Sequence, residues 1–153
     1  MIYLSIPSLP PSSNHAYFNL PHGGRKLTKE GEKYKNETIA HLAQTYRQEL
    51  KLFKLNIGYQ IFFRFTCEMI QNKLWKPGGK VNRYKKFDGG NLTKLLEDCL
   101  KSVGGIDDSQ TLVSAWQKKA GLPERTEIWA WSLEEENDPF DIDFYLDTLR
   151  GSK

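Results

Sequence analysis

The sequence predicts a single α+β domain in which two main helices pack on a mixed β-sheet. Two observations lead to this prediction. Two stretches of apolar residues repeat at helical spacing, and another alternates with the period of a β-strand. The chain has 153 residues, of which 39% are hydrophobic and 27% charged. This size and composition suit one globular domain with its own core and exclude collagen-like, coiled-coil and wholly disordered proteins.

One long strand and several short ones are expected. From about residue 57 to 68, apolar residues alternate with polar ones, which predicts a long strand with one buried face. Shorter β-like segments occupy residues 2–6, 16–20, 111–118 and 126–133. Residues 7–13 are rich in proline and serine, and Pro10-Pro11 cannot sit in a central strand.

The two helices are predicted by apolar residues three or four positions apart. The first covers residues 29–51, with Thr28 as its N-cap and Gly31 as a weak point in its first turn. The second covers residues 92–103 and shows one complete apolar stripe. Asn91 is its expected N-cap, and a pair of glycines ends it.

Charge divides the chain into a basic body, residues 1–133, and an acidic tail, residues 134–153. The body carries 20 bases and 12 acids, whereas the tail carries seven acids and two bases. A polyanionic partner would suit this body, but charges segregated on an ordinary surface would produce the same totals. The tail also contains six large apolar residues, which would let it dock on the body.

The two cysteines, Cys67 and Cys99, occupy apolar-face positions. We expect them to be reduced core thiols of a cytoplasmic protein rather than a disulfide framework or a zinc site. No apolar run approaches the roughly 20 residues that span a bilayer, and the N-terminus does not resemble a signal peptide. We therefore expect no membrane partner.

Three acids bracket the second predicted helix. Asp88 precedes it, and Asp107 and Asp108 follow it. Carboxylate oxygens are the hard ligands that Mg²⁺ and Mn²⁺ prefer, and such an ion can activate water and polarise a phosphoryl oxygen. The alternative is that these acids only shape the turns at the two ends of the helix.

Distance limits how these acids can meet. The helix is about 18 Å long, and residues 104–108 span at most about 17 Å when extended. We therefore expect the segment after the helix to turn back along it, so that Asp88 and Asp108 meet within one subunit. Otherwise the acids would have to meet across a dimer.

Lys94 lies one turn inside the same helix, on its polar face. From there it could contact a phosphate held at the helix N-terminus, beside the backbone N–H groups of Gly90 and Asn91. The alternative is an ordinary surface pair with Asp98, four residues later.

The segment 71–86 is basic and contains aromatic residues but no acid. Its cations are Lys73, Lys76, Lys80, Arg83, Lys85 and Lys86, and Trp75 and Tyr84 lie among them. This pattern is typical of a loop that follows a nucleic-acid backbone, because unbalanced cations repel one another unless a polyanion is present. A simple solvated loop is the alternative. The sequence contains no Walker A or Gly-x-Gly-x-x-Gly motif, so no nucleotide cofactor is expected.

Three segments carry a family resemblance. They are the Pro-Pro-Ser-Ser-Asn run within residues 9–17, the helix entry over residues 24–35, and Asp88-x-x-Asn91-Leu92-x-Lys94 with the later Asp107-Asp108-x-Gln110. In this order and spacing they resemble the RusA family of Holliday junction resolvases, small endonucleases associated with phages and bacteria. The resemblance covers most of residues 1–133, which would form a RusA-like nuclease domain.

The resemblance implies a homodimer that binds branched DNA at four-way junctions and nicks two strands symmetrically, in a bacterial or phage-infected cell. It implies Mg²⁺ or Mn²⁺ as cofactor. Asp88 and Asp108 would be the metal-binding catalytic carboxylates, and Lys94 would be the catalytic lysine that steadies phosphate charge. Asp107 would be their neighbour near the metal, and the Asn91 side-chain oxygen a possible further ligand.

One position departs from the family pattern. The family commonly has a second acid just before the asparagine, and here that position is Gly90. The leading hypothesis is a metal-dependent, structure-specific DNA endonuclease. The second is a junction-binding protein of the same fold, with catalysis impaired by the missing acid. The third is an α+β domain that binds another protein.

Overall fold

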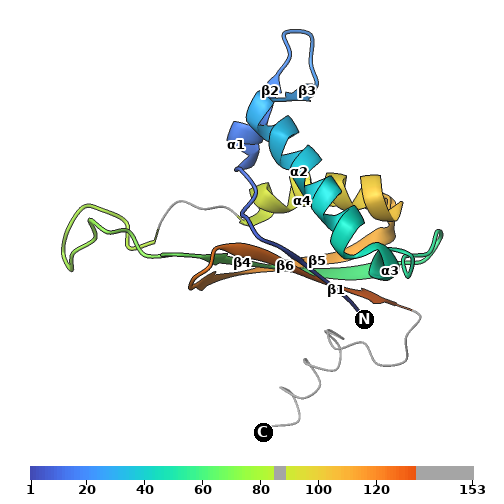
Figure 1. Cartoon of the computed structure of the whole chain (residues 1–153). Helices are drawn as coiled ribbons and strands as arrows, with labels where there is room; N and C mark the ends of the chain where they lie inside the picture. Colours follow the sequence, from blue (N-terminus) through green and yellow to red (C-terminus); the bar gives the residue numbers. More distant parts are fainter. Residues whose placement is uncertain (85–88, 134–153) are drawn as a thin grey trace, which may run out of the picture.

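The computed structural model describes residues 1–84 and 89–133. The expectations for Lys85, Lys86, Asp88 and the acidic tail lie outside these residues. The elements are β1 (Ile2–Ile6), α1 (Ser13–Ala16), β2 (Tyr17–Asn19), β3 (Arg25–Leu27), α2 (Lys29–Thr45), α3 (Arg47–Leu50), β4 (Tyr59–Cys67), α4 (Gly89–Gly104), the 3₁₀ turn η1 (Asp108–Gln110), β5 (Thr111–Ala120) and β6 (Arg125–Ser132). This is the predicted single α+β domain, with α2 and α4 as its main helices (Figure 1).

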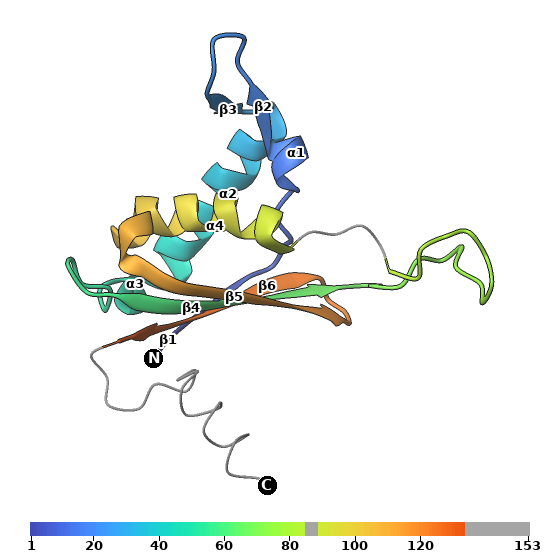
Figure 2. The ribbon, with the colours of Figure 1, turned by 180° about the vertical axis from the view of Figure 1, so that it is seen from behind.

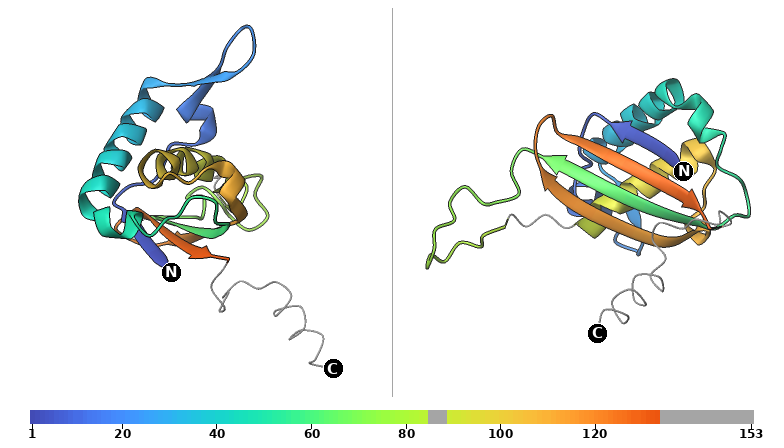
Figure 3. Two further views of the ribbon diagram at one scale, coloured as in Figure 1. Left: turned by 90° about the vertical axis from the view of Figure 1, so that its right-hand side faces the viewer. Right: turned by 90° about the horizontal axis from the view of Figure 1, so that it is seen from below.

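The main sheet is mixed and has the strand order β1-β6-β4-β5. Strands β4 and β5 are parallel, and α4 lies in the crossover that connects them. Strand β6 pairs antiparallel with both β1 and β4. Helices α2 and α4 cover the same face of this sheet, and Figures 2 and 3 show the opposite face without a helix from the described residues.

The core forms between that covered face and the two helices. On β4, Phe63 and Phe65 are fully buried, and on α4 Leu92, Leu95 and Leu96 are buried with them. The alternation on β4 and the stripe on α4 are therefore the patterns that the sequence predicts. Both cysteines are free and buried, as expected for core thiols, and burial raises the pKa of the Cys99 thiol to about 12.

Two helix boundaries differ from the sequence prediction. The first helix does not run unbroken to residue 51, because Tyr46 leaves helical backbone (φ −119°, ψ 30°). The chain then forms the short α3, which brings Leu50 into the core. The second helix begins before Asn91, which lies in its first turn and is not the N-cap. The Thr93 hydroxyl donates to the Gly90 carbonyl oxygen (3.0 Å), a contact that helical backbone at Gly90 allows.

The segment 16–20 is strand only in part. Ala16 ends the short helix α1, and β2 pairs with β3 in a two-stranded hairpin that projects beyond the helices (Figure 1). No helix in the described part of the chain is long and apolar enough to cross a membrane.

Gly31 is required by a close backbone approach. A Cβ atom at this position would lie 2.4 Å from the carbonyl oxygen of Ala16. The same oxygen accepts a hydrogen bond from the Thr28 N–H (2.8 Å), and the Thr28 side chain caps α2 at Gly31 N (3.1 Å). Glycine therefore lets the start of α2 pack directly on the end of α1.

This packing predicts the effect of Gly31→Ala. Replacing glycine by alanine inside a helix ordinarily stabilises it by about 1 kcal/mol, but here the added methyl group would overlap a backbone oxygen. We expect the free energy of unfolding to fall by about 1–3 kcal/mol, measured by urea denaturation. Gln44→Ala, at an exposed position of the same helix, is the control and should leave it nearly unchanged. A stabilised Gly31→Ala protein would contradict this packing.

Candidate active site

Helix α4 presents a polar face that points away from the core. Lys94 and Lys101 are exposed on it, and Asp98 is half-buried. The apolar stripe opposite these residues is buried against the sheet, so packing turns the polar face toward solvent. The orientation of the candidate lysine thus follows from the core.

Asp98 is engaged by the hairpin and not by Lys94. Its carboxylate accepts a hydrogen bond of 2.6 Å from the Tyr17 hydroxyl on β2. The pKa of Tyr17 is raised, first by burial and then by this hydrogen bond. Among the ion pairs of the described residues, none joins Lys94 to Asp98. The surface-pair alternative for Lys94 is therefore wrong, and its ammonium group is exposed to solvent.

Asp107 has a structural role at the turn after α4. Its carboxylate accepts a hydrogen bond from the Ser109 N–H (3.1 Å), while the Gln110 side chain accepts from the Asp107 N–H, which makes a capping box for η1. It also pairs with the Lys101 ammonium at 2.5 Å. The hydrogen bond from Lys101, followed by those from Ser109, lowers the pKa of Asp107 to about 2. For this residue the turn-shaping alternative agrees with the structure.

Asp108 lies near a carboxylate that the sequence prediction missed, that of Glu97. Burial is the main cause of the raised pKa of Glu97, and the charge of Asp108 adds to it. The Ser114 hydroxyl on β5 donates a hydrogen bond to the Glu97 carboxylate (3.3 Å). This hydrogen bond and the positive charge of Lys94 both lower the pKa of Glu97 and so oppose the effect of burial. The sequence points to Glu97 only through its spacing: it follows Lys94 by three residues and therefore lies on a neighbouring part of the helix surface.

The chain does turn back after α4. Gly105 adopts a positive φ of 69°, η1 follows, and β5 then runs beside the helix so that Ser114 meets Glu97. The acids themselves stay at the turn, where Asp107 pairs with Lys101. Glu97 lies eight residues after Gly89, about 12 Å along the helix axis. Because Asp88 lies outside the described residues, its meeting with Asp108 stays a prediction.

The donors on this surface suit a hard divalent cation, although they do not complete a site. Asp108 lies close enough to Glu97 for its charge to raise the pKa of the Glu97 carboxyl. Oxygen donors of this kind fit Mg²⁺ or Mn²⁺, which keep several waters and need few protein ligands. Within residues 1–84 and 89–133, no group of three histidine, cysteine or acidic side chains could hold a metal ion. Further oxygens would have to come from Asp88 and Asn91, as the sequence predicts.

The basic segment forms an arm that extends beyond the end of β4 (Figures 1 and 3). A bridge between Gln71 and Tyr84 closes the base of the arm. The Arg83 guanidinium lies over the rings of Trp75 (5.0 Å) and Tyr84 (5.5 Å). The described lysines of the arm and Arg83 are all exposed: Lys73, Lys76, Lys80 and Arg83. The interleaved aromatic residues thus organise the arm while its cations face solvent.

A comparison with protein families covers the segments described above. The family model described as Endodeoxyribonuclease RusA matches residues 7–129. The chain belongs to the RusA endodeoxyribonuclease family. The match includes β4, the basic arm, α4 and the turn that carries Asp108. A search of curated proteins gives no match. The chain thus belongs to a family of endodeoxyribonucleases that act on branched DNA junctions.

The contacts of Asp107 predict a pH dependence of stability. Its folded pKa of about 2 lies below the unfolded value of about 3.9. Asp107 therefore contributes stability that is present above about pH 4 and is lost as the pH falls through about 2. We expect the melting temperature of the wild-type protein to fall more steeply between these pH values than that of Asp107→Asn, in thermal unfolding followed by circular dichroism. Glu68→Gln, at an exposed position, should keep the wild-type slope. Equal slopes for wild type and Asp107→Asn would contradict the assignment.

Proposed function

We propose that this protein is a divalent-metal-dependent endonuclease that binds four-way DNA junctions as a homodimer and resolves them by paired symmetric nicks. The observation that carries the proposal is the RusA family match over the segment that contains Lys94 and Asp108. The structure adds that Lys94 is exposed on a helix whose opposite face is packed in the core.

Lys94 binds the scissile phosphate in this proposal. It lies near the N-terminal end of α4, where backbone N–H groups and the helix dipole also favour an anion. Because Asp98 is engaged by Tyr17, the Lys94 charge is available to the phosphodiester. A fixed ammonium group stabilises the negative charge that develops on the phosphoryl oxygens during hydrolysis.

Asp88 and Asp108 would hold Mg²⁺ or Mn²⁺, with Asn91 and Asp107 beside them. When bound, the ion supplies Lewis acidity and activation of water. The Glu97 carboxyl lies near Asp108 and accepts a hydrogen bond from Ser114, so in its charged form it would help to retain the cation.

The basic arm would hold the backbones of the junction arms. Its exposed cations contact phosphates irrespective of sequence, which suits an enzyme that recognises a branched structure. Binding of this kind weakens steeply with salt, because each phosphate contact releases counterions. A domain that binds only another protein would show no retention of DNA at low salt.

The direct test uses an end-labelled four-way junction and a matched linear duplex, each with Mg²⁺ and with Mn²⁺. We expect paired symmetric nicks confined to the junction. Asp88→Asn should abolish cleavage and preserve junction binding. Lys94→Ala should reduce the cleavage rate about a hundredfold or more, with Lys33→Ala, at an exposed position of α2, as the matched control. Cleavage by Lys94→Ala at the wild-type rate would remove the lysine from the mechanism.

A second function is favoured by Gly90, which leaves the first turn of α4 without an acid. In this alternative the protein binds junctions but cuts them poorly or not at all. A retarded but uncut junction with both metals would support it.

The substitution Gly90→Asp measures how much the missing acid matters. Gly90 is exposed and lies in helical backbone, so an aspartate can be accommodated, and the helix dipole favours it there. We expect cleavage to rise with Gly90→Asp and not with Gly90→Asn, which has the same size without the charge. An unchanged rate in both variants would mean that the acid is dispensable.

A further inference from the structure

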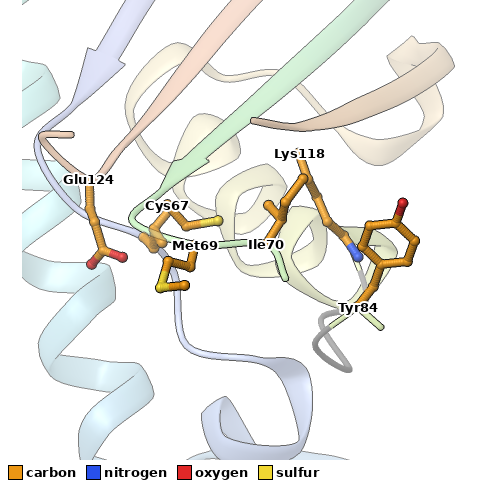
Figure 4. Close-up of a pocket in the computed structure, with 7 residues that line it drawn as sticks. Cys67, Met69, Ile70, Tyr84, Lys118 and Glu124 are labelled. Carbon is orange, nitrogen blue, oxygen red and sulfur yellow. The ribbon is translucent and has the colours of Figure 1, made fainter. Parts of the chain in front are cut away.

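A cavity of about 370 Å³ lies at the end of β4 from which the basic arm leaves. Its size falls in the range of about 300–1,000 Å³ that is usual for sites that bind small organic molecules. The residues that line it are Leu9, Cys67, Met69, Ile70, Tyr84, Lys118 and Glu124 (Figure 4). Among the described residues, Lys94 and the carboxylates of Glu97, Asp107 and Asp108 do not line this cavity.

The walls of the cavity are apolar, and its two ends are polar. Met69, Ile70 and Leu9 supply the apolar walls. Glu124 lies at one end, where its Oε1 accepts a hydrogen bond from the Glu68 N–H (3.2 Å), so the carboxylate is held in place. At the other end, Figure 4 shows the Lys118 side chain reaching past Ile70 toward the Tyr84 ring.

Tyr84 provides a stacking surface at this second end. Its side chain is 58% exposed, and the Gln71–Tyr84 bridge fixes its backbone beside the end of β4. The Arg83 guanidinium lies 5.5 Å from the Tyr84 ring centroid, so cationic and aromatic groups are combined at one place. Aromatic rings beside cations are the usual means by which proteins hold an unstacked base next to its phosphate.

We propose that this cavity binds one unstacked nucleobase of the DNA junction. The inference rests on the proposed function and adds a base-binding site to it. The base would lie between the apolar walls with its face against Tyr84, and Lys118 and Arg83 would meet the adjoining phosphates. The Glu124 carboxylate would accept a hydrogen bond from an exocyclic amino group, so the site would prefer an amino-bearing base to thymine.

A nucleobase fits these features better than a lipid or an apolar peptide would. The cavity has a fixed carboxylate acceptor at one end, and the segment beside it is rich in exposed cations. The energetic cost of unstacking a base is a few kcal/mol and is smallest where pairing is already disturbed. A branch point is such a place, so base capture would also favour junctions over linear duplexes.

The test is photo-crosslinking with 5-iododeoxycytidine placed at the branch point of a four-way junction. The full-length protein is used in EDTA, so that the junction is bound but not cut, and the crosslinked residue is mapped by mass spectrometry. We expect an adduct on Tyr84. With 5-iododeoxyuridine, which has a carbonyl in place of the amino group, we expect the yield to fall about fivefold, and Glu124→Gln should reduce this difference.

Two variants and a matched control separate the cavity from the surface around it. Met69→Trp should fill the cavity and remove the adduct. Tyr84→Ala, at an exposed position, should lower the adduct yield without a risk to folding. Leu74→Trp is the control, because Leu74 is 75% exposed in the same arm and does not line the cavity, so the adduct should persist.

The outcomes distinguish this inference from the proposed function. An adduct on a cavity residue that Met69→Trp abolishes and Leu74→Trp retains supports the base site. If the junction is bound but the adducts map elsewhere, or if Met69→Trp leaves them unchanged, the base site is refuted and the proposed function stands. If gel retardation shows no junction binding at low salt, both are refuted.

Discussion

The packing of α4 against β4 is the constraint on which the rest of the structure depends. Leu95 and Leu96 are fully buried with Phe63 and Phe65, so the helix can rotate very little about its axis. Lys94 lies between these leucines and Thr93, and its exposure is a direct result of their burial. The same packing directs Glu97 toward Ser114 on β5 and Asp98 toward Tyr17 on β2. One apolar contact thus sets the positions of the charged groups on the helix.

The carboxylates around α4 have different environments and therefore different tasks. Asp107 is paired and hydrogen-bonded, which stabilises its charged form and ties the turn to Lys101. Glu97 is partly desolvated and close to Asp108, which disfavours its charged form. A carboxylate that is already paired and hydrogen-bonded within the protein gains little from binding a cation. Two neighbouring carboxylates repel each other, and a bound cation would relieve that repulsion. In the function proposed above, Asp108 and Glu97 would therefore serve a metal ion better than Asp107.

Local patterns in the sequence predicted most of the fold, and contacts between distant segments explain the differences. The stripe on α4 and the alternation on β4 both depend only on residues that are near one another in the chain. The break at Tyr46 was not predictable, because Tyr46 and Leu50 continue the same helical spacing across it. Gly31 looked like a weakness of α2, and its value becomes visible only when the Ala16 carbonyl is seen beside it. The exposure of Lys94 could be predicted from the helical periodicity. The environment of Glu97 could not, because it depends on Ser114 of β5.

The crossover through α4 has a consequence for how the chain folds. Gln60 on β4 pairs with Val113 on β5, and the basic arm and α4 lie between them in the sequence. Closing so long a segment is entropically costly, so this pairing should form late and limit the folding rate. The cost grows only slowly with length, by about 0.6 kcal/mol for each doubling. The arm can therefore lengthen or shorten with little effect on equilibrium stability, so its length is not constrained by the core.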